Sequence, residues 1–196
     1  MHNILLFLPL SKLFTCKIQE KIYFIKKHII PIRKFEVILE KICIILDRLR
    51  SAHNTGNIFR IAEAIGASEI IACGYTPAPP HPKLAKTAMG TDEMVPCRVM
   101  PDAVTAIETL RQEGYKMILA AEYAPGSVFA WEKKYEFPLA IVLGNEALGV
   151  SPEALEAVDG LVSLPMFGEK CSINVGNAAA AILYAVIGVT HYGVEV

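Results

Sequence analysis

Short runs of apolar residues alternate with helical patterns from residue 42 onward. The runs rich in Ile, Val, Leu and Ala predict strands at 42–46, 69–73, 94–98, 116–121, 139–143 and 160–164. Helices are predicted at 57–65 and 101–113, from Ser151 onward, and along the uncharged stretch near the carboxyl end. Because strands without polar alternation are buried on both faces, the pattern predicts an α/β fold: a mostly parallel sheet with helices on both faces. Ligands bind such sheets at the carboxyl ends of the strands, so the loops at 47–57, 121–126, 144–150 and 165–173 are candidate site segments.

Residues 1–40 do not follow this alternation. Apolar residues at helical spacing over 17–30, ended by Pro31, predict a basic amphipathic helix. Residues 1–50 hold ten of the 19 Lys and Arg residues but four of the 20 Asp and Glu residues, although the whole chain has a formal net charge of −1. The basic segment indicates either an arm that contacts an anionic partner, such as RNA or a membrane surface, or a helix with a solvated face. We therefore predict a basic extension over 1–40, helical or partly disordered, and a globular domain over 41–196.

Composition bears on the compartment and on metal binding. The 5 cysteines are odd in number and lack zinc-ligand spacing with histidine, which indicates a reducing compartment and no metal site. The apolar start lacks a preceding cation and a cleavage site, so we expect no export and a cytoplasmic location. The uncharged stretch 171–194 is long enough to span a bilayer, but it contains Asn174 and Asn177. We expect a buried or interface helix there, and no membrane association.

The predicted loops concentrate amide, small and ionisable residues in three segments. In the first, Asn54 is a candidate helix cap, and Arg60 is either a phosphate-binding group or a surface arginine paired with Glu63. In the second, Gly144 and Gly149 allow close backbone approach on either side of an acid, but neither a dinucleotide motif nor a phosphate-binding lysine is present. The third, 164–175, leads into a helix whose run of alanines, 178–181, favours tight packing; its Cys171 has no nucleophile motif around it.

Together, three stretches resemble the motifs of a known family: N-T-G-N-I-F-R-I-A-E-A-I-G (54–66), I-V-L-G-N-E-A-L-G-V-S (141–151) and L-P-M-F-G-E-K-C-S-I-N-V-G-N-A-A-A-A (164–181). They are similar to those of the SpoU/TrmH family of RNA ribose 2′-O-methyltransferases, in the SPOUT superfamily. The resemblance covers about residues 42–190, with the motifs in the family's order and spacing. Ile173 replaces the usual leucine, and residues 1–40 match no family extension that we can place.

The resemblance implies a carboxyl-terminal trefoil knot and a homodimer whose active site is completed across the interface. It implies S-adenosylmethionine as methyl donor, without metal, and RNA, either tRNA or rRNA, as substrate. By motif position the implied catalytic residues are Arg60, Asn54, Glu146, Ser172 and Asn174. The implied cofactor-binding residues are Ala121, Leu143, Gly144, Leu164, Met166 and Ile173.

The family proposal makes the motif-one arginine a general base. Because a guanidinium group stays protonated throughout the physiological range, we expect Arg60 instead to orient the substrate and stabilise charge. Two other functions stay open: a catalytically silent module that binds RNA or S-adenosylmethionine, and a small-molecule methyltransferase. The presence of both Arg60 and Glu146 argues against the silent module, and the basic segment favours RNA over a small molecule.

Overall fold

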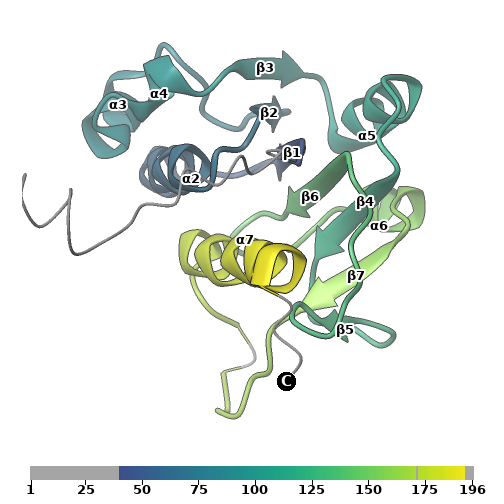
Figure 1. Cartoon of the computed structure of the whole chain (residues 1–196). Coiled ribbons are helices and arrows are strands. Elements are labelled where there is room, and N and C mark those ends of the chain that lie inside the picture. The colour runs from purple at the N-terminus through teal and green to yellow at the C-terminus, as the bar shows by residue number, and fades with distance from the viewer. Residues whose placement is uncertain (1–39, 171, 193–196) are drawn as a thin grey trace, which may run out of the picture. The chain divides into compact units, whose positions relative to one another are not determined.

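The computed structural model describes residues 40–170 and 172–192 (Figure 1). The strands are β1 Ile42–Asp47, β2 Glu69–Cys73, β3 Cys97–Met100, β4 Met117–Ala121, β5 Val128–Phe129, β6 Leu139–Leu143 and β7 Gly160–Ser163. The helices are α2 Ala52–Ile65, α3 Pro82–Ala88, α4 Thr91–Met94, α5 Ala103–Gln112, α6 Pro152–Ala157 and α7 Val175–Tyr192. None of these described helices is long and apolar enough to cross a membrane.

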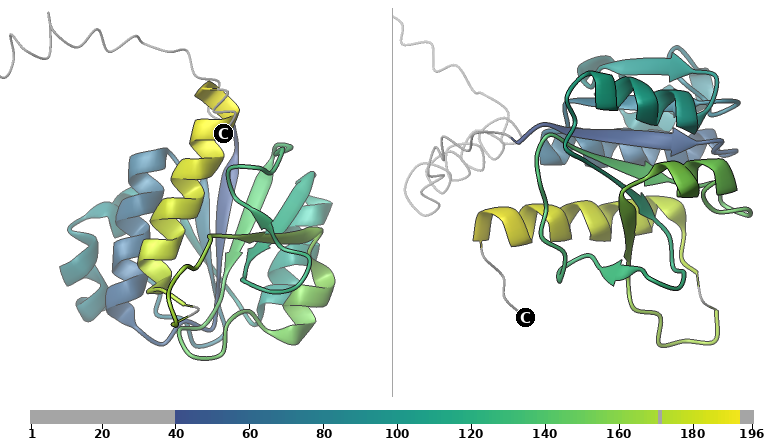
Figure 2. Two further views of the ribbon diagram at one scale, coloured as in Figure 1. Left: turned by 90° about the horizontal axis from the view of Figure 1, so that it is seen from below. Right: turned by 90° about the vertical axis from the view of Figure 1, so that its right-hand side faces the viewer.

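The strands form a seven-stranded sheet in the order β3-β2-β1-β6-β4-β7-β5. Every pair of neighbouring strands in it is parallel. Helices α2, α3, α4 and α7 cover one face, and α5 and α6 cover the other (Figures 1 and 2). The predicted α/β fold with a mostly parallel sheet and helices on both faces is confirmed. The trefoil knot stays a prediction.

Strand β1 lies between β2 and β6 and supplies a core to each face. Its side chains alternate between the two sides of the sheet. Ile42, Ile44 and Leu46 pack with α2 and α7, and Cys43 and Ile45 pack with α5 on the other side. All six residues of β1 are buried, which explains the apolar run from Ile42 to Leu46.

Two predicted boundaries and one predicted helix cap were wrong. The third strand was predicted at 94–98, but Met94 ends α4 and the strand begins at Cys97. Helix α2 begins at Ala52 rather than at 57, because the Ser51 side chain accepts the Asn54 N–H and caps it. Asn54 therefore lies inside the first turn and is not the cap. The short elements α3, α4 and β5 were not predicted; the His81 ring caps α3 by accepting the Leu84 N–H.

The alanines of α7 do not form one packing face, contrary to our expectation. Successive residues of a helix point about 100° apart, so four in a row surround the axis. Ala179 is fully buried, Ala178 lines a cavity described below, and Ala181 is exposed. The helix predicted over 17–30 and Cys171 both lie outside the described residues.

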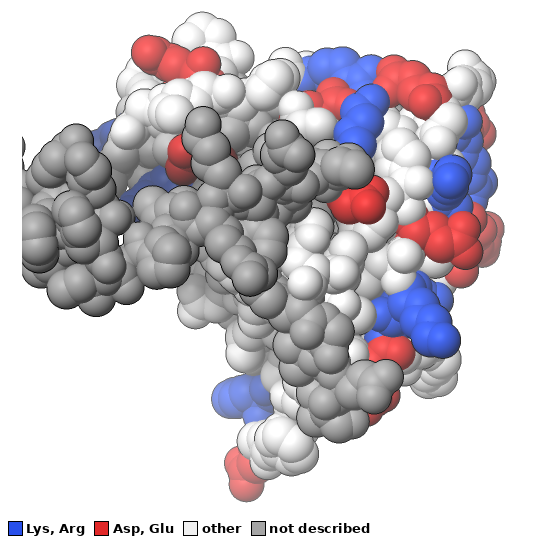
Figure 3. All heavy atoms as spheres, in the orientation of Figure 1, with Lys and Arg blue, Asp and Glu red and all other residues white. Residues whose placement is uncertain are grey.

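Charged side chains of both signs are intermixed on the face around α5 (Figure 3). Arg98 of β3 pairs with Glu69 at 2.6 Å and with Glu113 at 2.6 Å. Arg111 of α5 pairs with Asp159 at 2.8 Å. The described part of this face is therefore a set of ion pairs rather than a surface of a single charge.

Candidate active site

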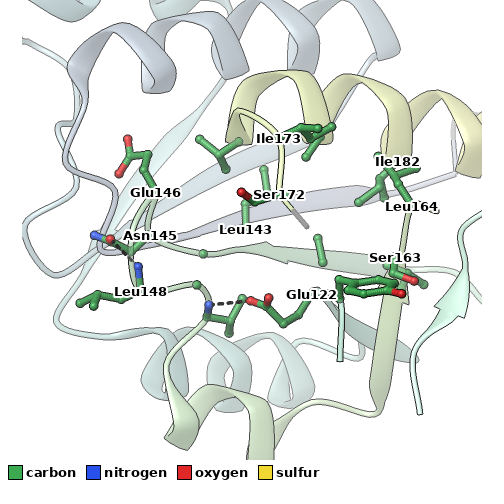
Figure 4. Close-up of a pocket in the computed structure, with 18 of the residues that line it drawn as sticks. Glu122, Leu143, Asn145, Glu146, Leu148, Ser163, Leu164, Ser172, Ile173 and Ile182 are labelled. Carbon is green, nitrogen blue, oxygen red and sulfur yellow. Dashed lines mark hydrogen bonds between the residues drawn. The ribbon is translucent and has the colours of Figure 1, made fainter. Parts of the chain in front are cut away.

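A cavity of about 470 Å³ lies at the carboxyl ends of β4, β6 and β7, beside the start of α7 (Figure 4). Every cofactor-binding residue implied by the motifs lines it: Ala121, Leu143, Gly144, Leu164, Met166 and Ile173. Glu146 and Ser172 also line it. These residues converge because the carboxyl ends of parallel strands meet at one edge of the sheet.

Two backbone segments approach closely at Gly144. A Cβ atom at this position would lie 2.2 Å from both the Gly149 carbonyl carbon and the Val150 nitrogen. Asn145 and Gly149 form an antiparallel bridge, with both of its N–H to O distances at 2.9 Å. Gly149 itself has φ of 68°, a conformation that favours glycine. The two glycines thus fold residues 144–150 into a tight loop that forms one wall of the cavity.

Buried polar side chains hold this loop against the end of β1. The Asn145 amide nitrogen donates to the Arg48 carbonyl at 2.5 Å and to the Tyr75 hydroxyl at 3.1 Å. The carboxylate of Asp47, which is 1% exposed, accepts the Ser151 N–H at 2.7 Å. These bonds therefore hold the loop against the end of β1. Neither Asn145 nor Asp47 was predicted from the sequence in this role.

One hydrogen-bonded chain joins the three motif segments. The Asn54 amide nitrogen donates to Glu146 Oε1 at 2.9 Å, and the Asn174 amide nitrogen donates to Asn54 Oδ1 at 3.1 Å. The N–H groups of Arg50 and Ser51 also donate to the Glu146 carboxylate, at 2.9 and 3.0 Å. The structure thus brings together the motif residues of α2, the 144–150 loop and the start of α7.

The pKa of Glu146 lies below its ordinary value. Partial burial acts to raise it, but the hydrogen bonds from Arg50, Asn54 and Ser51 stabilise the charged form and outweigh burial. Glu146 is consequently a carboxylate that orders the start of α2, and a poor acceptor for a proton.

Asn174 also organises the start of α7. Its Oδ1 atom accepts the Gly176 N–H at 2.9 Å and the Asn177 N–H at 3.4 Å. Gly176 permits close contact with α2, since a Cβ there would lie 2.6 Å from the Asn57 amide nitrogen. Ser172 is exposed at the cavity, two residues before Asn174.

Arg60 does not line this cavity. It lies exposed on α2, and within the described part of the chain no hydrogen bond or ion pair involves it. The alternative prediction of a pair with Glu63 is therefore wrong. Asn54 and Asn174 also lie outside the cavity lining, although they connect to Glu146, which is part of it.

Glu122 and Tyr123 line the cavity but were not predicted as site residues. Both follow β4 directly, within the loop at 121–126 that the strand pattern marked as a candidate. That position at a carboxyl strand end was the available signal. Within the described residues, no group of three His, Cys, Asp or Glu residues is placed to hold a metal ion.

A family model described as the SpoU rRNA Methylase family matches residues 41–184. The chain belongs to this family. The assignment made from the three motif segments is confirmed.

Curated relatives align over most of this chain. A tRNA (guanosine(18)-2′-O)-methyltransferase of Thermus thermophilus is 33% identical over 156 residues, which are 78% of this chain and 79% of that protein. A 23S rRNA (uridine(2479)-2′-O)-methyltransferase of Streptomyces viridochromogenes is 30% identical over 147 residues, 74% of this chain and 51% of that protein.

Solved SpoU structures share the fold. AviRb from Streptomyces viridochromogenes, a SpoU methyltransferase in complex with AdoMet, superposes with a TM-score of 0.68 at 28% identity, covering 76% of this chain and 57% of that chain. The TrmH/SpoU tRNA modifying enzyme of A. aeolicus has a TM-score of 0.68 at 27% identity, covering 80% and 81% of the two chains.

Proposed function

We propose that this protein transfers a methyl group from S-adenosylmethionine to a ribose 2′-hydroxyl of tRNA or rRNA. The observation that carries the proposal is the hydrogen-bonded chain Glu146–Asn54–Asn174, which joins the three motif segments at the edge of the cavity. Relatives named as tRNA and rRNA 2′-O-methyltransferases support it, as does the AdoMet complex of a structure with the same fold.

The cavity fits S-adenosylmethionine in size and lining. Its volume of about 470 Å³ lies within the range of small-molecule sites. Leu143, Leu164 and Ile173 offer apolar walls for an adenine ring, and Gly144 leaves main-chain groups accessible beside them. Ala121 and Met166 complete the set that would hold the cofactor. When bound, S-adenosylmethionine supplies a methyl group that its sulfonium already activates.

The protein's own residues would then align the ribose oxygen. Asn54 and Asn174 each retain a free amide hydrogen beyond the bonds described, and so can orient a hydroxyl group near the cavity edge. Glu146 holds α2 against the loop, and Ser172 lies beside the cavity. We assign to Arg60 the orientation of phosphate and ribose through its planar set of donors, rather than deprotonation.

We propose a homodimer, because Arg60 lies outside the cavity of its own chain and needs a second copy to reach one. The exposed residues Asn177, Ala181 and Tyr184 recur along one side of α7, an uncharged helix, and support an interface there. We place the dimer in the cytoplasm, with RNA as partner and without membrane association.

We also propose that 41–196 forms the methyltransferase domain and that 1–40 is a basic arm. The excess of Lys and Arg in residues 1–50 supports contact with RNA.

Methyl transfer from labelled S-adenosylmethionine to RNA tests the proposed function. Purified protein and unmodified tRNA or rRNA should yield 2′-O-methylated nucleosides after digestion, also with a chelator present. Asn174→Ala should abolish the product, whereas Glu156→Ala, an exposed substitution on α6, should not. Binding of S-adenosylmethionine and RNA without transfer would instead identify a silent module.

A further inference from the structure

The cavity contains a carboxylate with one oxygen that bonds to no other residue within 40–170 and 172–192. Of the acidic residues that line it, Glu146 bonds through both oxygens to the start of α2. Glu122 Oε2 accepts the Val150 N–H at 3.0 Å, and no bond joins its Oε1 to any other residue that the structure describes. Glu122 lies among the cavity residues of Figure 4, with the dashed line marking that single bond.

The surrounding backbone accommodates this carboxylate closely. A Cβ atom at Gly149 would lie 2.6 Å from Glu122 Oε2, so the glycine leaves the space that the acid occupies. The Val150 N–H holds the side chain in one orientation. A carboxylate fixed in this way presents its second oxygen as a preorganised hydrogen-bond acceptor.

The neighbours of Glu122 indicate which part of a nucleoside ligand it meets. It follows β4, which lies between β6 and β7, and apolar Val150, Leu155 and Val162 line the cavity with it. Apolar walls suit an adenine ring, and the ribose is bonded directly to that ring. The charged amino-acid end of S-adenosylmethionine requires water or charged partners, which these neighbours do not supply. An acid at the carboxyl end of a parallel strand is well suited to accept hydrogen bonds from ribose hydroxyls.

We propose that Glu122 Oε1 accepts hydrogen bonds from the ribose hydroxyl groups of the bound methyl donor. This assignment rests on the proposed function, in which S-adenosylmethionine occupies the cavity. It adds to the motif-derived set a side chain that recognises the sugar, where the other cofactor residues offer apolar or main-chain contacts.

Calorimetric titration with S-adenosylhomocysteine and its 2′-deoxy and 3′-deoxy analogues tests the assignment. For the wild type, loss of either hydroxyl should weaken binding about ten- to a hundredfold, as for hydrogen bonds to charged groups. In Glu122→Ala both deoxy analogues should bind about as well as S-adenosylhomocysteine, because the acceptor is gone. Glu122→Gln keeps a carbonyl for the Val150 N–H and should show reduced discrimination with an intact loop. Glu156→Ala serves as the control and should discriminate as the wild type does.

The outcomes separate this assignment from the proposed function. If Glu122→Ala weakens all ligands equally and keeps the discrimination, Glu122 only supports the loop and the assignment fails. If Glu122→Ala weakens S-adenosylhomocysteine but not methylthioadenosine, which lacks the amino-acid portion, the acid binds the ammonium group and the assignment also fails. A wild type that binds none of these ligands would overturn the proposed function itself.

Discussion

Amide and carboxylate side chains at the site bind main-chain groups as well as one another. Glu146 accepts the N–H groups of Arg50 and Ser51, and Asn174 accepts those of Gly176 and Asn177. Each side chain therefore fixes the start of a helix and also takes part in the bonds between motif segments. A substitution at either position is expected to change both local order and activity.

Glu146 gives the protein a pH-dependent part of its stability. Its pKa in the folded state lies below the ordinary 4.5, so its contribution is present above that value and is lost as the pH falls toward the lowered pKa. Glu146→Gln should cost about 1 kcal/mol in the free energy of unfolding at pH 7, since the site is exposed. The difference between wild type and variant should shrink below about pH 4.5.

Denaturant unfolding between pH 7 and pH 3.5 measures this difference. Glu156→Gln, which removes an exposed carboxylate from α6, is the control and should match the wild type. A difference between Glu146→Gln and wild type that stays constant with pH would refute the role of the charge.

Variants of Arg60 test whether this side chain orients the substrate or removes a proton from it. Arg60→Ala should lower single-turnover methylation by roughly 10²-fold or more while binding of S-adenosylmethionine stays near wild type. Arg60→Lys keeps the charge but not the planar donors, and should retain a small part of the rate. Arg111→Ala, on α5 and paired with Asp159, is the control and should remain active.

A pH series distinguishes the two roles of Arg60. If it orients the substrate, the ratio of lysine-variant to wild-type rate should not change with pH. A lysine variant whose rate rises as the pH increases past neutral would support general-base catalysis instead.

Close backbone packing between elements forms the cavity wall. The loop after β6 folds so tightly that residues 144 and 149–150 are in direct contact. Gly144 lines the cavity, so a side chain there would take up space inside it. The structure shows that it would first overlap the protein's own backbone, so its effect belongs to folding as well as to binding.

Gly144→Ala should therefore destabilise the fold by more than about 3 kcal/mol, because backbone cannot move aside as a flexible side chain does. Gly168→Ala is the matched control, since no atom lies within 4 Å of its Cβ position, and should change stability by no more than about 1 kcal/mol. Thermal or chemical unfolding of both variants measures the contrast. Equal stability of the two variants would contradict the packing argument.

Elements with continuous apolar sequence could be predicted closely, whereas short capped elements could not. The predicted strand at 139–143 coincides with β6, and Ser151 and Pro152 begin α6 as expected. Helix α3 depends on a His81 cap and on contact of its backbone with Gly56 of α2. Such contacts leave no periodic pattern in the sequence, so α3, α4 and β5 were missed.

Across the whole molecule, the motif order predicted where the cavity would lie but not how its residues are held. The implied cofactor residues line one cavity because strand ends converge at one edge of the sheet. The bond from Asn145 to Tyr75 and the bond from Asp47 to Ser151 connect residues that are distant in sequence. Nothing in the local sequence marks such partners, nor does it show that Glu122 uses only one oxygen for bonds to the described residues.

The homodimer prediction concerns the assembly of whole molecules. Light scattering at micromolar concentration should give twice the chain mass of 21.5 kDa. Tyr184→Glu, which places a charge on the exposed side of α7, should give monomers with little activity. Val99→Glu, at an apolar residue that is 65% exposed on β3, should stay dimeric. A monomeric wild type would contradict the completion of the site by a second copy.

The most direct test of the central claim is a map of 2′-O-methylated nucleotides in RNA from cells with and without this protein. We predict that at least one 2′-O-methyl ribose in tRNA or rRNA disappears when the protein is absent. It should return with the wild-type protein and with the Glu156→Ala variant, but not with Arg60→Ala. An unchanged map, or the loss of a base methylation in place of a ribose methylation, would contradict the account.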